Sequence, residues 1–556
     1  MNPQPEFLHH RPDASYWTSE HKKEFEEGAL PVYLAGCRWF GGKARKLKST
    51  KVVECIPLDR EDIADGALNC LVVQAVYEDG GGERFLMPVR LLEGRLAREE
   101  GEFRPQDVIV QCGGERGTGV LVDALCDPAF RMLLLELAAT GGGRTGARGR
   151  LAGNPSRVLE EMRRRGCLPS NSRSPGVEQS NSSIFYEDKL FLKLFRRVRE
   201  GMNPDLEMIR YLSEEAHFSH VPQYAGHLEY VCEGEPPTVV ALLQGLVACE
   251  ADAWAFTLNV LERYVEWLLE NRRAVGVVAP GGTPGQGAPK MVLDYLENTY
   301  LPKARLLGRR TAELHLALSR KTGNSRFGVE IFSRFDQRCA DARIKRALKE
   351  TSEVLEKRLP GLAPETRGEA ENFLRDAPLF DRAREMLVRR NVHVGKIRIH
   401  GDYHLGQVLH GGADFFIIDF EGEPVRGLDE RCAKNLAMVD LAGMLRSFDY
   451  AAQSALLHRH VDEKGCREFL LPCVDLWYRW VKRAFLDSYL SVTCGAPFIP
   501  ADTADFHDLL CLFQLEKAVY ETLYELNNRP GWLSIPLRGI SQLLQRFRED
   551  GDEDGK

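Results

Sequence analysis

Strand-like and helix-like segments are segregated along this 556-residue chain. From Val52 to about Asp123, and again from residue 182 to 247, short runs rich in β-branched and aromatic residues alternate with turn residues. Beyond about residue 250 most of the chain repeats apolar residues at helical spacing, as in ARLLGRRTAELHLALSR and LLCLFQLEKAVYETLYELNNR. This segregation predicts an α+β fold with a large helical C-terminal part.

Composition narrows the class of protein. The length exceeds what one compact core supports, so we expect two to four packed subdomains. The 74 basic and 81 acidic side chains are interspersed, which favours a small-molecule ligand over nucleic acid. No apolar run approaches a membrane span, and the 14 cysteines lie singly without a C-x-x-C pair, which argues against a zinc site or a disulfide framework. We expect a cytoplasmic protein with neither a membrane segment nor a nucleic-acid partner.

Two polar motifs carry the chemistry. IHGDYHLGQVL occupies residues 399–409, and IIDFEGEP begins at residue 417 after an apolar run. Phosphoryl transfer needs a carboxylate to orient or deprotonate a hydroxyl, together with oxygen ligands for Mg²⁺. Asp402 fits the first role, and Gln407 and Asp419 fit the second. Glu421 either helps to hold the metal or is a solvated side chain, while His400 and His404 are expected to orient the loop.

The pair of motifs resembles the catalytic and metal-binding segments of the aminoglycoside phosphotransferase-like branch of the protein-kinase fold, with Gln407 where asparagine is usual. The resemblance implies a bilobal kinase-like fold that binds ATP and Mg²⁺. It also implies that Lys193, paired with Glu207, contacts the nucleotide phosphates, and that a strand ending near residue 246 is the hinge. The remaining nucleotide-binding candidates are the phosphate-loop hydroxyls and the hinge backbone: Ser180, Ser182, Ser183, Gln244 and Leu246.

CRWFGGKAR at residues 37–45 and YELNNRPGWLSIPLRGI at 524–540 resemble segments of bacterial maltokinases. Such enzymes transfer the γ-phosphoryl group of ATP to the anomeric hydroxyl of maltose, giving maltose 1-phosphate for α-glucan or glycogen synthesis, and they associate with trehalose synthase. The resemblance implies four regions. They are an N-terminal cap (1–115), a nucleotide-binding lobe (116–246), a helical lobe with the catalytic loop and sugar site (247–548), and an acidic, disordered tail (549–556).

A sugar site needs aromatic faces and hydrogen-bonding side chains, and the C-terminal helices offer both. Several of these groups recur at i, i+4 spacing and so share a helix face. Interhelical salt bridges remain the alternative interpretation of the same residues. The candidates for sugar binding are Arg446, Asp449, Tyr520, Glu521, Tyr524, Glu525, Asn528, Arg529 and Trp532.

Two other functions stay open. The first is a kinase of another sugar, such as glucosamine, because acidic residues near the sugar site suit an acceptor that carries an amine. The second is a non-catalytic, kinase-like partner of trehalose synthase. The joint presence of Lys193, Asp402, Gln407 and Asp419 argues against the second, since a decayed site would lose some of them.

Overall fold

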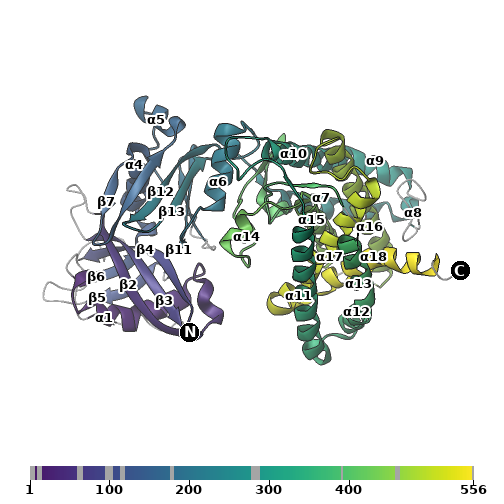
Figure 1. The fold of residues 1–556 in the computed structure, drawn as a ribbon, viewed down its shortest axis with the longest axis horizontal. Coiled ribbons are helices and arrows are strands. Elements are labelled where there is room, and N and C mark those ends of the chain that lie inside the picture. The colour runs from purple at the N-terminus through teal and green to yellow at the C-terminus, as the bar shows by residue number, and fades with distance from the viewer. Residues whose placement is uncertain are drawn as a thin grey trace. The chain divides into compact units, whose positions relative to one another are not determined.

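The computed structural model describes residues 7–8, 16–58, 67–93, 104, 106–112, 119–175, 181–276, 278, 289–389, 392–457 and 464–553. The chain forms two compact units. The first comprises residues 1–214 with 222–248, and the second comprises residues 215–221 with 249–556. Each is described by itself below (Figure 1).

The first unit begins with a mainly antiparallel sheet. Its order among the described residues is β1-β5-β6-β4-β3-β2, and β11 also pairs with β4. The short helices η1 (Tyr16–Thr18), α1 (Lys22–Glu24), η2 (Phe25–Ala29), α2 (Leu30–Gly36) and η3 (Gly41–Ala44) precede most of it. The strands are β1 (Phe7–Leu8), β2 (Leu47–Pro57), β3 (Leu68–Tyr77), β4 (Gly82–Glu93), β5 (Val108–Cys112), β6 (Gly119–Asp123) and β11 (Arg197–Val198).

This first sheet buries both of its faces. Strand β3, with the sequence LNCLVVQAVY, is almost continuously apolar for this reason. Alternate residues of a strand point to opposite faces. Leu71 and Val73 enter a core shared with the N-terminal helices. Cys70 and Val72 enter a second core, which contains residues of the next sheet. The two sheets of the unit are therefore joined by a continuous apolar layer.

The second sheet has the order β7-β8-β12-β13-β10-β9. Helix α4 (Pro128–Thr140) packs so closely on β8 that a Cβ at Gly153 would lie 1.8 Å from the Leu137 carbonyl oxygen. Helices α5 (Arg157–Arg164) and α6 (Pro204–Arg210) complete this part. The strands are β7 (Gly143–Thr145), β8 (Gly149–Pro155), β9 (Ser182–Tyr186), β10 (Leu190–Leu194), β12 (Tyr224–Cys232) and β13 (Thr238–Gly245).

Two buried polar side chains also join the two sheets. Glu54 of β2 is buried, and its carboxylate accepts hydrogen bonds from the backbone N–H groups of residues 147, 148 and 149 at 2.8–3.0 Å and from the Tyr230 hydroxyl at 3.1 Å. Arg196, which is 0% exposed, donates to the Ser182 hydroxyl and pairs with Asp123, each at 2.8 Å. These contacts hold β2 against the β7–β8 turn and the end of β6 against β9.

The second unit is a helical assembly around a small sheet. Helix α10 packs against α16, and a Cβ at Gly308 would lie 2.2 Å from the Phe485 carbonyl oxygen. Helix α15 packs against α7, α16 and α17. The main helices are α7 (Ala253–Glu270), α9 (Lys290–Thr299), α10 (Leu301–Ser319), α11 (Arg334–Arg358), α12 (Pro364–Arg375), α13 (Ala377–Arg389), α15 (Met438–Leu457), α16 (Lys464–Val492), α17 (Thr503–Asn528) and α18 (Ser534–Glu553), with the short α8 (Arg272–Val275) and α14 (Leu428–Cys432).

A three-stranded sheet in this unit carries the two chemical motifs. Its order is β14-β17-β18, formed by β14 (Ala251–Asp252), β17 (Val408–Gly411) and β18 (Asp414–Ile417). The β17–β18 hairpin turns at Gly412, whose φ of +69° suits glycine. A second pair joins β15 (Glu330–Ile331) to β16 (Gly395–Lys396), just before the first motif.

The structure corrects two predictions about local structure. The Gly- and Arg-rich stretch 141–157, whose composition predicts a loop or short connecting structure, contains the β7–β8 hairpin, which is stabilised by pairing with β12 and by Glu54. The acidic tail, predicted as disordered from 549, is helical as far as Glu553, where α18 ends. The remaining three residues lie outside the described part of the chain.

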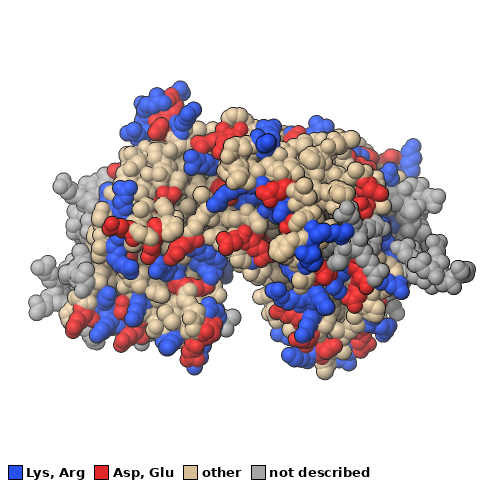
Figure 2. Space-filling model, in the orientation of Figure 1, with Lys and Arg blue, Asp and Glu red and all other residues tan. Residues whose placement is uncertain are grey.

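Charges of both signs are interspersed on the face of the molecule shown in Figure 2, and basic side chains gather over α5. Glu161 pairs with two of these arginines, Arg164 and Arg165. None of the helices among the described residues is both long and apolar enough to cross a bilayer.

Candidate functional site

The first motif forms a tight loop whose backbone is hydrogen-bonded to Asp440 of α15. The buried carboxylate of Asp440 accepts hydrogen bonds from the backbone N–H groups of His400 at 2.8 Å and Gly401 at 2.9 Å, and from His315 Nε2 at 3.1 Å. Burial raises the pKa of Asp440, but the hydrogen bond and charge of His315 lower it more, so that the net pKa is below its usual value. An ionised buried anchor therefore fixes the backbone next to Asp402.

The two motifs are also tied to each other. His400 Nε2 donates to the Ile418 carbonyl oxygen at 2.9 Å, and the Ile418 N–H donates to the Gln407 carbonyl at 3.0 Å. The amide Nε2 of Gln407 donates to Asp419 Oδ2 at 2.8 Å. The two side chains predicted to hold Mg²⁺ therefore lie together, and their role as metal ligands stays a prediction.

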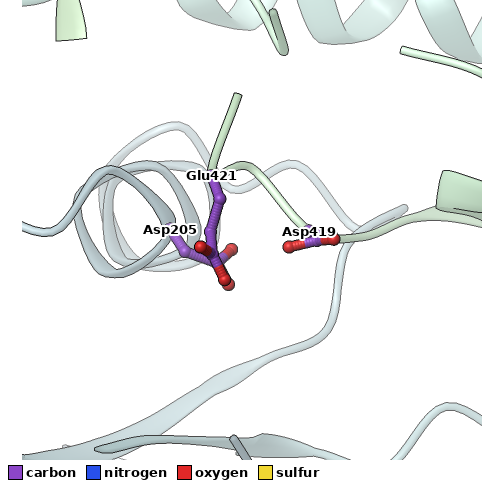
Figure 3. Close-up of side chains that lie close together, drawn as sticks. All are labelled: Asp205, Asp419 and Glu421. Carbon is purple, nitrogen blue, oxygen red and sulfur yellow. The ribbon is translucent and has the colours of Figure 1, made fainter. Parts of the chain in front are cut away.

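Asp419 has a strained backbone. Its φ is +65°, a left-handed conformation that non-glycine residues rarely adopt and that costs about 1–3 kcal/mol. Such outliers cluster at functional sites, where surrounding structure enforces them. Figure 3 shows Asp419 and Glu421 on the loop that follows β18, and it also labels Asp205, which α6 carries in the first unit.

Asp402 borders a cavity of about 290 Å³ formed within the second unit by the first motif, the residues after Asp419, α11 and α17. Lys517 of α17 donates to Asp402 Oδ1 at 3.2 Å and to Glu423 Oε1 at 2.5 Å. Glu423 also accepts from Arg426 Nε at 2.6 Å. Burial raises the pKa of Glu423, but the charges and hydrogen bonds of Lys517 and Arg426 have a larger, opposite effect, so the net pKa falls to about 2. Paired charges therefore form part of the cavity lining.

Of the nine residues predicted to bind sugar, Tyr520 is the one that lines this cavity. Arg446, Asp449 and Glu521 instead form a buried network between α15 and α17, in which Arg446 donates to Asp449 at 2.6 Å and to Glu521 at 2.9 Å. These three residues therefore form the interhelical salt bridges that were the alternative to sugar binding. A buried arginine needs such carboxylate partners.

The remaining candidates lie around the end of α17. Glu525 accepts from Arg529 at 2.7 and 3.0 Å and from the Tyr450 hydroxyl at 3.3 Å. The Arg529 guanidinium lies 5.5 Å from the Tyr524 ring centroid and 4.9 Å from that of Trp532. Asn528 donates to the Tyr524 carbonyl within the helix. These contacts form a helix-end cluster outside the cavity lining.

In the first unit, Lys193 lies on β10, as predicted. Its Nζ donates to Asp205 Oδ2 at 2.9 Å, and both side chains are largely buried. The expected partner, Glu207, lies two residues further along α6. Asp205 is placed by the first turn of α6, where the Asn203 side chain caps the helix by accepting from the Leu206 N–H. Asp205 is therefore an ion-pair partner of this lysine, and the pairing with Glu207 stays a prediction.

The other nucleotide-binding candidates divide. Ser180 lies outside the described residues. Ser182 is buried, and its hydroxyl accepts from Arg196, so it supports the sheet; Ser183 lies beside Lys193 in the β9–β10 pairing. On the predicted hinge strand, Gln244 pairs with Tyr224 and Phe191. The Leu246 N–H already donates to the Lys189 carbonyl at 2.8 Å, which argues against it as the adenine donor.

Sequence reasoning missed Lys517, Glu423, Asp440 and His315. A signal for two of them was present. Lys517 precedes Tyr520 by three residues on the same helix and so shares its face. Glu423 lies four residues after Asp419 in the second motif. The roles of Asp440 and His315 depend on packing between α15, α10 and the catalytic loop, which no local pattern reveals.

Comparisons with known proteins show what the chain is similar to. Residues 33–127 match the sequence profile of the maltokinase N-terminal cap domain family. A glucosamine kinase of Streptacidiphilus jiangxiensis is 23% identical over 474 residues, which cover 80% of this chain and 92% of that protein. A glucosamine kinase of Mycolicibacterium smegmatis is 29% identical over 147 residues, covering 26% of this chain and 34% of that protein.

Among solved structures, a glucosamine kinase in complex with glucosamine, ADP and inorganic phosphate is similar with a TM-score of 0.59. The match has 19% sequence identity and covers 92% of this chain and 96% of that one. The chain therefore has the bilobal kinase-like α+β fold predicted from its sequence, with an N-terminal cap and a large helical C-terminal region. That fold prediction is confirmed.

Proposed function

We propose that this chain is an ATP-dependent sugar kinase. The observation that carries the proposal is the setting of Asp402, which is held from one side by Lys517 and borders a cavity large enough for a small ligand. Asp402 Oδ2 has no hydrogen-bond partner among the described residues. It is the oxygen that would accept a proton from a sugar hydroxyl.

The reaction is an in-line transfer. The acceptor oxygen forms a bond to the γ-phosphorus as the bond to the β-phosphate oxygen breaks, ADP leaves, and the hydroxyl proton passes to Asp402. Lys193, paired with Asp205, would contact the ATP phosphates. Removing the Asp402 carboxylate abolishes the base without removing nucleotide contacts.

The donor set near Asp402 fits Mg²⁺. Gln407 and Asp419 offer an amide oxygen and a carboxylate, the hard ligands that Mg²⁺ takes, and their 2.8 Å contact brings them together. In this proposal Gln407 and Asp419 hold the ion, with Glu421 as a further carboxylate. Bound Mg²⁺ would neutralise charge on the nucleotide phosphates.

For the acceptor we propose glucosamine first. One glucosamine kinase matches 80% of this chain in sequence and a solved glucosamine kinase structure covers 92% of it. A cavity of about 290 Å³ lies at the small end of ligand sites, which suits a monosaccharide. Maltose, the acceptor that the sequence resemblance implies, is the second candidate. The cap-domain match at residues 33–127 favours it, and with it an association with trehalose synthase.

The test is ADP release from ATP and Mg²⁺ in the presence of glucosamine, maltose, glucose or trehalose, and without sugar. Glucosamine-dependent release that disappears in Asp402→Asn supports the first proposal. Release that depends on maltose alone keeps the kinase and exchanges its acceptor. ATP binding without any sugar-stimulated release overturns the kinase and favours the non-catalytic partner.

A further inference from the structure

We propose that Lys517 is a positioning residue for phosphoryl transfer, which fixes the Asp402 carboxylate so that one of its oxygens faces the acceptor. The inference rests on the proposed kinase function. Lys517 lies 115 residues after Asp402 in the sequence, and the packing of α17 brings its ammonium to the catalytic loop.

Lys517 is held by two carboxylates at once. Its Nζ lies 2.5 Å from Glu423 Oε1 and 3.2 Å from Asp402 Oδ1. Burial lowers the pKa of Lys517, but the Glu423 and Asp402 carboxylates raise it above its usual value, so the side chain remains an ammonium. An ammonium in this position holds both carboxylates by charge-assisted hydrogen bonds.

Glu423 is itself fixed. Besides Lys517 it pairs with Arg426, which also contacts Glu430 of α14 at 3.1 Å. Arg343 of α11 pairs with Glu516, the neighbour of Lys517, at 2.5 and 3.1 Å. Lys517 is carried by α17 and Glu423 is held by Arg426, so both have contacts outside the catalytic loop.

The loop backbone alone does not fix the Asp402 carboxylate. Asp440 holds the backbone N–H groups of residues 400 and 401, and it leaves rotation about the side-chain bonds of Asp402 open. Lys517 removes that freedom by binding Oδ1. The free Oδ2 is then presented in one orientation, as a general base requires.

Glu521 does not duplicate this role. It is paired with Arg446 at 2.8 Å, one helical turn beyond Lys517 on α17. The Lys517 ammonium also lies 5.1 Å from the Tyr520 ring centroid, so the lysine and the aromatic wall of the cavity are in contact. Loss of Lys517 therefore affects Asp402 and the adjacent acceptor wall and leaves the Arg446 network intact.

The experiment is a double-mutant cycle on kcat and KM with Lys517→Met, Asp402→Asn and the double variant. Because misplacement of a reacting group by about 1 Å can cost about 100-fold, we expect Lys517→Met to lower kcat by about 10- to 100-fold. The KM for ATP should change less than about 3-fold. In the Asp402→Asn background the same change should lower kcat less than about 3-fold, because both residues act through one carboxylate.

Lys517→Arg is the rescue variant and should recover part of kcat. Lys349→Met is the control and should leave turnover unchanged. It removes an exposed lysine of α11 whose Nζ lies 3.8 Å from Glu353 Oε1. Glu423 retains Arg426 in Lys517→Met, so the variant should fold. Equal losses of kcat with and without Asp402, or unchanged kcat in Lys517→Met, overturn the role of Lys517. Absence of sugar-dependent ADP release by the wild-type chain overturns the proposed function instead.

Discussion

Two charge networks, one buried between sheets and one at the edge of a cavity, use the same kinds of side chain for different ends. In the first unit Glu54 and Arg196 join two sheets, and the Glu54 carboxylate accepts five hydrogen bonds from the chain itself. In the second unit the Lys517–Glu423–Asp402 cluster borders a cavity, and one Asp402 oxygen is left for a ligand. A saturated network stabilises the fold, whereas a network with one open acceptor at a cavity can carry out chemistry.

The largest expected effect breaks the open network. Asp402→Asn should lower kcat by about 10²- to 10⁴-fold, the usual contribution of a general base, because an amide does not accept the hydroxyl proton. ATP affinity, measured by calorimetry, should stay within a few-fold of the wild-type value. Turnover like that of the wild type would contradict the assignment of Asp402.

Breaking the saturated network should instead destabilise the protein. Glu54→Ala leaves four backbone N–H groups and the Tyr230 hydroxyl without the buried carboxylate that accepts from them, and we expect a loss of about 2–3 kcal/mol. Chemical denaturation followed by tryptophan fluorescence measures it. Glu78→Ala removes an exposed partner of Lys46 and should cost under about 0.5 kcal/mol. Equal midpoints for both variants would contradict the role of Glu54.

Two buried aspartates of α15 sharpen the comparison within one helix. Asp440→Asn weakens the hold on the catalytic loop, because an amide offers one acceptor where the carboxylate uses both oxygens. We expect kcat to fall about 10-fold or more. Asp449→Asn, in the Arg446 network, should lower stability and leave kcat within about 3-fold. Similar kcat losses in both variants would show that α15 acts through general stability alone.

Acid should weaken the ion pair that joins the β17–β18 hairpin to α10. Arg310 binds both oxygens of Asp414, at 2.6 and 2.8 Å. Burial raises the pKa of Asp414, but this pairing lowers it below its usual value. Since the folded-state pKa is depressed, the stabilisation is present above about pH 4 and is lost as the pH falls below that value.

Asp414→Asn should therefore lower the denaturation midpoint at pH 7 by an amount equivalent to about 1–2 kcal/mol. The difference from the wild type should shrink at pH 3. A difference that stays constant between the two pH values would contradict the electrostatic origin.

The smallest effect separates two tyrosines that are stacked on one helix. The rings of Tyr520 and Tyr524 lie 6.4 Å apart, yet Tyr520 lines the cavity and Tyr524 is 44% exposed. Tyr520→Ala should raise the KM for the sugar by about 10-fold, because a sugar stacks on an aromatic face. Tyr524→Ala should change it less than about 2-fold. A larger effect at Tyr524 would extend the acceptor site beyond the cavity.

The order of chemical groups was readable from the sequence. Asp402, Gln407 and Asp419 lie on short motifs beside apolar strands, and Lys193 lies on a strand, because local spacing places them there. The β9–β10 hairpin and the helical C-terminal part follow from the same periodicities, whereas the kinase-like fold was predicted from the resemblance of the two motifs to a known family. The pairing of Lys193 with Asp205 was not foreseen, because Asp205 and Glu207 lie in one helical turn and only the position of β10 brings a carboxylate of that turn to the lysine.

The sequence by itself determined which chemistry the chain carries, since residue type and local spacing fix the motifs and the strands and helices that present them. Tertiary structure alone decided which distant charges meet. Arg446 pairs with both Asp449 and Glu521, while Lys517 reaches Asp402 across 115 residues. The physical reason is that a buried charge needs a partner, and helix packing, which sequence periodicity leaves open, determines which partner is within reach.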